Sequence, residues 1–176
     1  MNINCCYGIS SECDNFQHVL MMDYDGISLN TVKEHLKYIQ KDYDLSDIYI
    51  IKSKHGYNAI SLDKMQLSII YHLGISVFSP TDRNFFKYGF ERQYYVLRFD
   101  NDKELVEILK NNSSKYEKSL AHKLFLEFFF NMKINCNNLG HNTKLKIIQY
   151  PSYKNGFHSV PKNVDGYIDD LKRWKQ

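Results

Sequence analysis

Two aspartates separated by one residue follow directly after an apolar segment near the start of the chain. Asp23 and Asp25 flank Tyr24, and residues 19–22 before them read Val-Leu-Met-Met. Because alternate side chains of an extended segment point the same way, the two carboxylates should share one face, opposite Tyr24. Two carboxylates this close repel each other unless a cation lies between them, and hard oxygen ligands favour Mg²⁺ or Mn²⁺. The pair therefore predicts a divalent-metal site, although the same pattern is common in solvated turns that follow strands.

A hydroxyl and an imidazole form a second candidate pair. Ser53 and His55 lie in the segment Ser-Lys-His-Gly between two apolar stretches, where Gly56 favours a tight hairpin. Side chains of this kind beside a backbone turn can bind phosphate oxygens, so we expect Ser53 and His55 to contact a nucleotide. The alternative is a hairpin with two exposed polar residues.

A third aspartate follows another apolar segment. Arg98 and Asp100 continue the alternation of residues 93–99 and should share a face. A carboxylate from this strand would complete a metal site with Asp23 and Asp25, and Asp102 is the rival donor two residues further on. The alternative is an ordinary strand end with a surface ion pair.

Cations and aromatic residues alternate over residues 83–92. The segment contains Arg83, Lys87, Arg92, Phe85, Phe86, Tyr88 and Phe90. Charge and stacking together suit contact with nucleic acid, which we expect at Arg83 and Lys87. Arg92 or Arg98 would neutralise the charge of a triphosphate. The equal alternative is a loop whose aromatic residues enter the core while its cations stay solvated.

The elements that must position these residues follow from hydrophobic periodicity and turn signals. We expect strands over residues 16–22, 47–52, 57–62, 93–99 and 144–150, and helices over residues 28–43, 64–73, 103–111, 115–132 and 164–174. Asp63 should cap the second helix, residues 1–15 should be irregular, and residues 75–92 should form a loop with short pieces of structure. The order β-α-β-β-α-β predicts an α+β fold with a ferredoxin-like sheet, as in RNA-recognition motifs. One domain over residues 1–176 is expected, with its core at about 16–102 and a mainly helical extension over 103–176.

Composition restricts the class of protein further. The chain has 176 residues, 43% of them hydrophobic, and a net charge of +3, which permits nucleic-acid binding without requiring it. The four cysteines form no C-x-x-C pair, so we expect reduced thiols and no zinc site. No apolar run matches a signal peptide or a membrane span, so we expect an intracellular, cytoplasmic protein without a membrane partner. No phosphate-binding glycine loop of P-loop type and no G-x-S-x-G motif is present.

Taken together, the three motifs resemble those of the archaeo-eukaryotic primase superfamily, which includes the primase–polymerases. That family carries h-h-D-h-D, S-x-H and h-D motifs, where h is hydrophobic, on a sheet like that of RNA-recognition motifs. Here they read Met21-Met22-Asp23-Tyr24-Asp25, Ser53-Lys54-His55 and Phe99-Asp100. The matched region spans about residues 16–102. The zinc-binding element of many primases and any helicase or accessory module are not evident.

The resemblance implies a template-directed nucleotidyltransferase, a DNA primase or polymerase. Asp23, Asp25 and Asp100 would be catalytic and would bind two ions of Mg²⁺ or Mn²⁺, while Ser53 and His55 would hold the phosphates of a nucleoside triphosphate. The partners would be a template with its primer and other replication proteins, and the small size suggests a viral or plasmid origin. Two alternatives stay open: a metal-dependent nuclease or other nucleotidyltransferase, and a non-enzymatic protein that binds single-stranded nucleic acid through aromatic residues.

Overall fold

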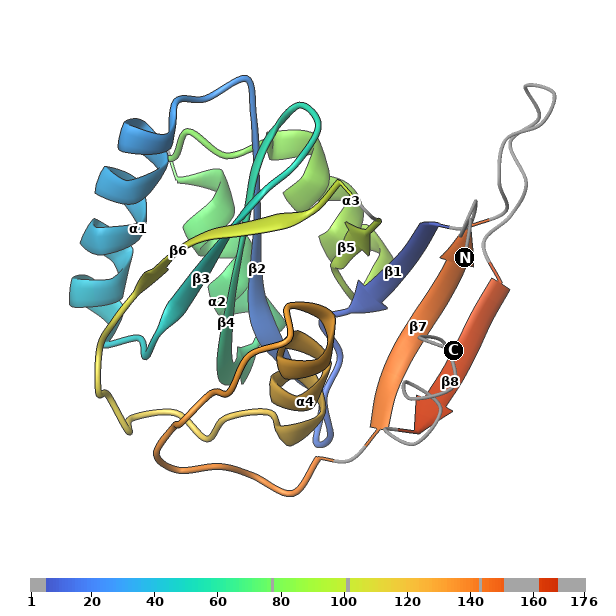
Figure 1. Ribbon diagram of the computed structural model, residues 1–176. Coiled ribbons are helices and arrows are strands. Elements are labelled where there is room, and N and C mark those ends of the chain that lie inside the picture. Colours follow the sequence, from blue (N-terminus) through green and yellow to red (C-terminus); the bar gives the residue numbers. More distant parts are fainter. Residues whose placement is uncertain (1–5, 77, 101, 143, 151–161, 168–176) are drawn as a thin grey trace, which may run out of the picture.

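The described part of the chain combines two antiparallel four-stranded sheets with four helices (Figure 1). These elements were identified in a computed structural model that describes residues 6–76, 78–100, 102–142, 144–150 and 162–167. Their order is β1 (Cys6–Ser10), β2 (Gln17–Asp25), α1 (Leu29–Tyr43), β3 (Ile48–Lys52), β4 (Gly56–Gln66), α2 (Leu67–Ile75), α3 (Arg83–Arg92), β5 (Val96–Phe99), β6 (Glu104–Leu109), α4 (Leu120–Phe129), β7 (Lys144–Tyr150) and β8 (Lys162–Tyr167). The predicted α+β class is confirmed.

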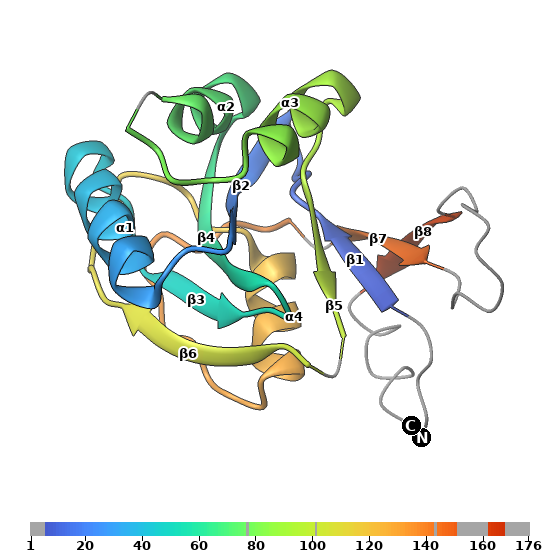
Figure 2. The ribbon, with the colours of Figure 1, turned by 90° about the horizontal axis from the view of Figure 1, so that it is seen from above.

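The first sheet has the strand order β2-β4-β3-β6 and holds the Asp-Tyr-Asp motif at the end of β2. Helices α1 and α2 lie on one face of this sheet and α4 lies on the other (Figure 2). Both faces are therefore covered, which explains why residues 18–22 of β2 are buried without alternation. The register aligns Asp23 with Asn58 and Asp25 with Gly56 on β4.

Local sequence accounts for α1, which was predicted over residues 28–43. The Ser28 hydroxyl caps its first turn by accepting a hydrogen bond from the Thr31 amide, and Asp44 ends it in the left-handed conformation. Val32 and Leu36 are buried at helical spacing and attach the helix to the sheet. The helix therefore lies close to its predicted position.

The second sheet has the order β5-β1-β7-β8, and it changes the predicted topology. Strand β1 lies in the segment that was expected to be irregular, and β5 pairs with β1 instead of joining the sheet of β2. Helix α4 lies between the two sheets (Figure 1), where Phe125 packs edge-on against Phe99 of β5 at 4.9 Å between ring centroids. Asp100, directly after β5, therefore comes to the pocket of the Asp-Tyr-Asp motif from a different sheet.

Three predictions for the residues after α2 are wrong. Residues 103–111 were expected to be a helix, but β6 pairs with β3 along the edge of the first sheet, where tertiary pairing overrides a helix-like pattern. Residues 83–92 form α3 and not a loop, because Asp82 caps the helix and Gln93 ends it. Residues 162–167 form β8, which replaces the start of the helix expected over 164–174; residues 168–174 lie outside the described residues. Among the described residues after 103, three strands accompany a single helix, so this part is not mainly helical.

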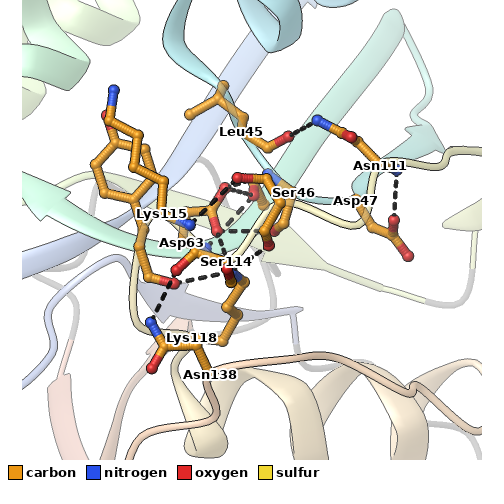
Figure 3. Close-up of polar contacts among 12 residues, drawn as sticks. Leu45, Ser46, Asp47, Asp63, Asn111, Ser114, Lys115, Lys118 and Asn138 are labelled. Carbon is orange, nitrogen blue, oxygen red and sulfur yellow. Dashed lines mark hydrogen bonds and ion pairs between the residues drawn. The ribbon is translucent and has the colours of Figure 1, made fainter.

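Asp63 was expected to cap a helix, but β4 continues through it and buries it completely. Its carboxylate accepts hydrogen bonds from the Ser46 amide and the Ser46 hydroxyl, both at 2.7 Å, and from the Ser61 hydroxyl at 3.0 Å. The Lys118 ammonium lies 3.5 Å away and also donates to two backbone carbonyls. Figure 3 shows this cluster, which fixes β4 to the segments before β3 and α4.

Candidate metal and phosphate site

A pocket of about 520 Å³ opens where β2, the β3–β4 hairpin, α3 and β5 meet. It is lined by every residue that was predicted to be catalytic or nucleotide-binding: Asp23, Asp25, Ser53, His55, Arg92, Arg98 and Asp100. Residues from four separate segments thus share one cavity, although β5 belongs to a different sheet from β2.

The Asp-Tyr-Asp motif has the alternation expected of a strand end. Tyr24 is completely buried on one face, whereas Asp23 is partly buried and Asp25 is exposed on the other. The Tyr24 hydroxyl shares a hydrogen bond of 2.8 Å with Nδ1 of His35 on α1. Burial lowers the pKa of His35 to about 4, so this imidazole is neutral at pH 7. The buried Tyr24 therefore anchors the strand and holds both aspartates toward the pocket.

The third carboxylate of the cluster is Asp82, which no motif in the sequence marks. Carboxylate oxygens of Asp23, Asp25 and Asp82 all lie within 4.8 Å of one another. The Asp82 amide donates a 2.9 Å hydrogen bond to the Asp23 carbonyl, which fixes the two backbones together, and its side chain caps α3 at the Asn84 amide. Asp100 lines the same pocket but does not belong to this group of three.

The surroundings of Asp23 disfavour the charged form of its carboxylate. Burial raises the pKa of Asp23 to about 6, and the neighbouring carboxylates of Asp25 and Asp82 contribute in the same direction, against smaller opposite effects of Lys103 and Asn58. Three carboxylates in this arrangement supply the hard oxygen ligands that Mg²⁺ and Mn²⁺ prefer, and a bound cation would relieve their repulsion. The donor set therefore fits a divalent cation.

The β3–β4 hairpin holds Ser53 and His55 beside the carboxylates. The Gly26 amide donates to the His55 carbonyl at 2.9 Å, which ties the hairpin to the turn after Asp25. A Cβ atom at Gly56 would lie 1.9 Å from the Tyr24 carbonyl oxygen, so only glycine permits this approach of β4 to β2. The Ser53 side chain is half-buried and the His55 side chain is exposed, so both are open to a ligand.

The predicted cations fall into two groups. Arg92 and Arg98 are exposed and line the pocket, whereas Arg83 and Lys87 are exposed on α3 but do not line it. The pocket also contains Lys103, which follows β5 and was not predicted to bind a nucleotide or nucleic acid. The alternative interpretation of this segment, in which its aromatic residues enter the core, holds in part, because Phe86 is completely buried there.

No family model, curated protein or solved structure matches this chain. Across the described residues, no helix combines the length and the apolar character that a membrane crossing requires.

Proposed function

We propose that this protein is a divalent-metal-dependent nucleotidyltransferase of the primase–polymerase type. The observation that supports the proposal most strongly is the convergence of the three motifs on one pocket, since nothing in their separation along the chain requires it. A polyanionic nucleotide with its cation needs both carboxylates and cations within one cavity. The carboxylates are those of Asp23, Asp25 and Asp82, and the cations are the guanidinium groups of Arg92 and Arg98.

The arrangement of the first sheet agrees with the proposed relationship to RNA-recognition motifs. The segments β2, α1, β3 and β4 follow one another in β-α-β-β order, with β4 between β2 and β3. The aspartates lie at the end of β2 and the Ser-Lys-His turn joins β3 to β4, as the motifs of the primase superfamily would require. Strand β5 departs from that scheme, because it pairs with β1.

The roles follow from the chemistry of each group. Asp23, Asp25 and Asp82 would hold a first cation of Mg²⁺ or Mn²⁺, and Asp100 would serve a second one within the same pocket. When bound, such cations activate a primer hydroxyl and stabilise the leaving pyrophosphate. Ser53, His55 and the two arginines would hold the triphosphate, with the arginines offering paired donors to its oxygens.

The decisive test is nucleotide incorporation on a primed template, and primer synthesis without one, with Mg²⁺ or Mn²⁺. We expect activity in the wild type, no activity in the double variant Asp23→Ala/Asp25→Ala, and full activity in Asp102→Ala, whose exposed carboxylate lies outside the pocket. Circular dichroism should show an unchanged fold in all three. A wild type inactive with both metals, or a double variant that remains active, would refute the proposal.

Binding of single-stranded nucleic acid without catalysis is the second candidate, and the surface of α3 favours it. Tyr88 is 53% exposed and Phe90 is 36% exposed, and the Lys87 ammonium lies 5.7 Å from the Tyr88 ring centroid. Exposed aromatic side chains beside cations suit stacking with unpaired bases. If this is the function, affinity for a single strand should survive EDTA and the double aspartate substitution, and should fall in Tyr88→Ala.

A further inference from the structure

Asn58 lies beside the metal cluster in a position that no motif marks. It faces Asp23 directly across the β2–β4 register, and its side chain is only 5% exposed. The Asn58 amide nitrogen donates a 2.7 Å hydrogen bond to Oδ1 of Asp23. On its other side, the Asn58 amide oxygen accepts a hydrogen bond from the Lys103 ammonium. A buried amide thus connects a pocket lysine to the central carboxylate.

The chemistry of these groups fixes the direction of the chain of hydrogen bonds. A lysine ammonium can only donate, so it must face the Asn58 oxygen. The Asn58 NH₂ group is then obliged to face Asp23, whose Oδ1 must accept. The Asp23 carboxylate, which can only accept, favours the same orientation of the amide. Lys103 and Asp23 therefore hold the Asn58 amide in one orientation from its two sides, and Asn58 occupies one oxygen of Asp23.

We propose that Asn58, oriented by Lys103, is the positioning residue that presents the second carboxylate oxygen, Oδ2 of Asp23, to the divalent cation. This inference rests on the proposed function, because it presupposes that the cluster binds a cation. Hydrogen-bond partners that orient a ligating side chain contribute to metal affinity, and their loss commonly costs about 10–100-fold. In this arrangement neither Asn58 nor Lys103 would be a ligand of the cation.

Manganese affinity, measured from the electron paramagnetic resonance of free Mn²⁺, tests the inference with no need for catalysis. We expect Asn58→Leu, which is close in size but has no polar group, to weaken Mn²⁺ binding by about tenfold or more. Lys103→Met should also weaken it. That direction is diagnostic, because removal of a nearby positive charge would by itself tighten cation binding.

Lys54→Met is the matched control, since Lys54 lines the same pocket and its loss tests charge alone. It should leave Mn²⁺ affinity unchanged or slightly tighter. Lys103→Arg, which keeps a donor, should restore part of the affinity lost in Lys103→Met. The side-chain NH₂ resonances of Asn58 should shift in Lys103→Met and stay in place in Lys54→Met.

The outcomes separate this inference from the proposed function. If the wild type binds no Mn²⁺, both the proposed function and the role of Asn58 are refuted. If the wild type binds Mn²⁺ but folded Asn58→Leu binds equally well, only the role of Asn58 is refuted. Should Asn58→Leu fail to fold, Lys103→Met decides: affinity equal to or above that of Lys54→Met would overturn the inference, and weaker affinity would support it.

Discussion

Asp23 and Asp63 lie on neighbouring strands of one sheet, and their surroundings are opposite. Asp63 is completely buried, accepts hydrogen bonds from an amide and two hydroxyls, and has Lys118 as a counter-ion. Asp23 faces an open pocket, accepts a hydrogen bond from Asn58, and lies within a group of three carboxylates. The contrast separates a carboxylate whose charge the protein itself balances from one whose charge a cation would balance.

This difference has a physical consequence for the folded chain. A buried carboxylate with its hydrogen bonds and charge satisfied contributes to stability only as part of its cluster, because removal of one member leaves the others unpaired. Carboxylates that repel one another lower the stability of the folded state, and a bound cation would remove this repulsion. We therefore expect substitutions at the two sites to act in opposite directions.

The largest effect should come from Asp63→Asn. The change removes the charge that balances Lys118 and places an NH₂ group against the donors from Ser46 or Ser61. We expect the free energy of unfolding to fall by about 3–5 kcal/mol, the usual cost of breaking a buried ion pair. Urea denaturation followed by circular dichroism measures this loss. Asp102→Asn, at an exposed position, should stay within about 0.5 kcal/mol of the wild type. A loss below about 1 kcal/mol in Asp63→Asn, well under that usual cost, would show that the cluster in Figure 3 is not a structural anchor.

The next effect should be stabilisation by the metal itself. A ligand that binds only the folded state raises the free energy of unfolding by about 2.7 kcal/mol at a concentration of about 100 times its dissociation constant. We expect Mn²⁺ to raise the melting temperature of the wild type and of any folded Asp63 variant, and EDTA to reverse the rise. Asp23→Ala/Asp25→Ala should show no such rise. An equal rise in the double variant would place the cation elsewhere on the chain.

The features of the pocket that were predictable from sequence are those that depend on local alternation. In the turn before Gly56, Ser53, Lys54 and His55 all line the pocket, so alternation does not account for that pair. In β2 it does: Asp23 shares a face with Asp25 because both lie at the end of the strand with one residue between them. Such spacing determines direction within a few residues, whatever the rest of the fold does.

Asp82, Asn58 and Lys103 could not be found in this way, because tertiary contacts bring them to the pocket. Asp82 reaches Asp23 through a backbone hydrogen bond from the start of α3, a helix that was expected to be a loop. The Thr-Asp-Arg sequence before an aromatic stretch was the available signal for a capped helix. Pairing with β3 likewise decided the state of β6, whose sequence is compatible with a helix. Neither outcome follows from periodicity alone.

The smallest change in the free energy of unfolding should appear in Asp23→Asn without metal. Its sign should be opposite to that of Asp63→Asn. The pKa of Asp23 is raised to about 6 in the folded state, so the native protein holds this proton more tightly than the unfolded chain. Wild-type stability should therefore fall as pH rises from about 4 to about 6. The substituted amide still accepts the hydrogen bond from Asn58 but cannot ionise, so the variant lacks this part of the decline.

Above about pH 6 we expect Asp23→Asn to be more stable than the wild type by about 1–2 kcal/mol, less than the full shift implies because the side chain is partly exposed. Near pH 4, where the wild-type carboxyl is protonated in the folded state, the two should converge. Urea denaturation at pH values of about 4 and about 8, with Asp102→Asn as the control, measures the difference on either side of the raised pKa. A variant less stable than the wild type at the higher pH would mean that Asp23 is a structural carboxylate like Asp63, held by partners within the protein and not poised for a cation.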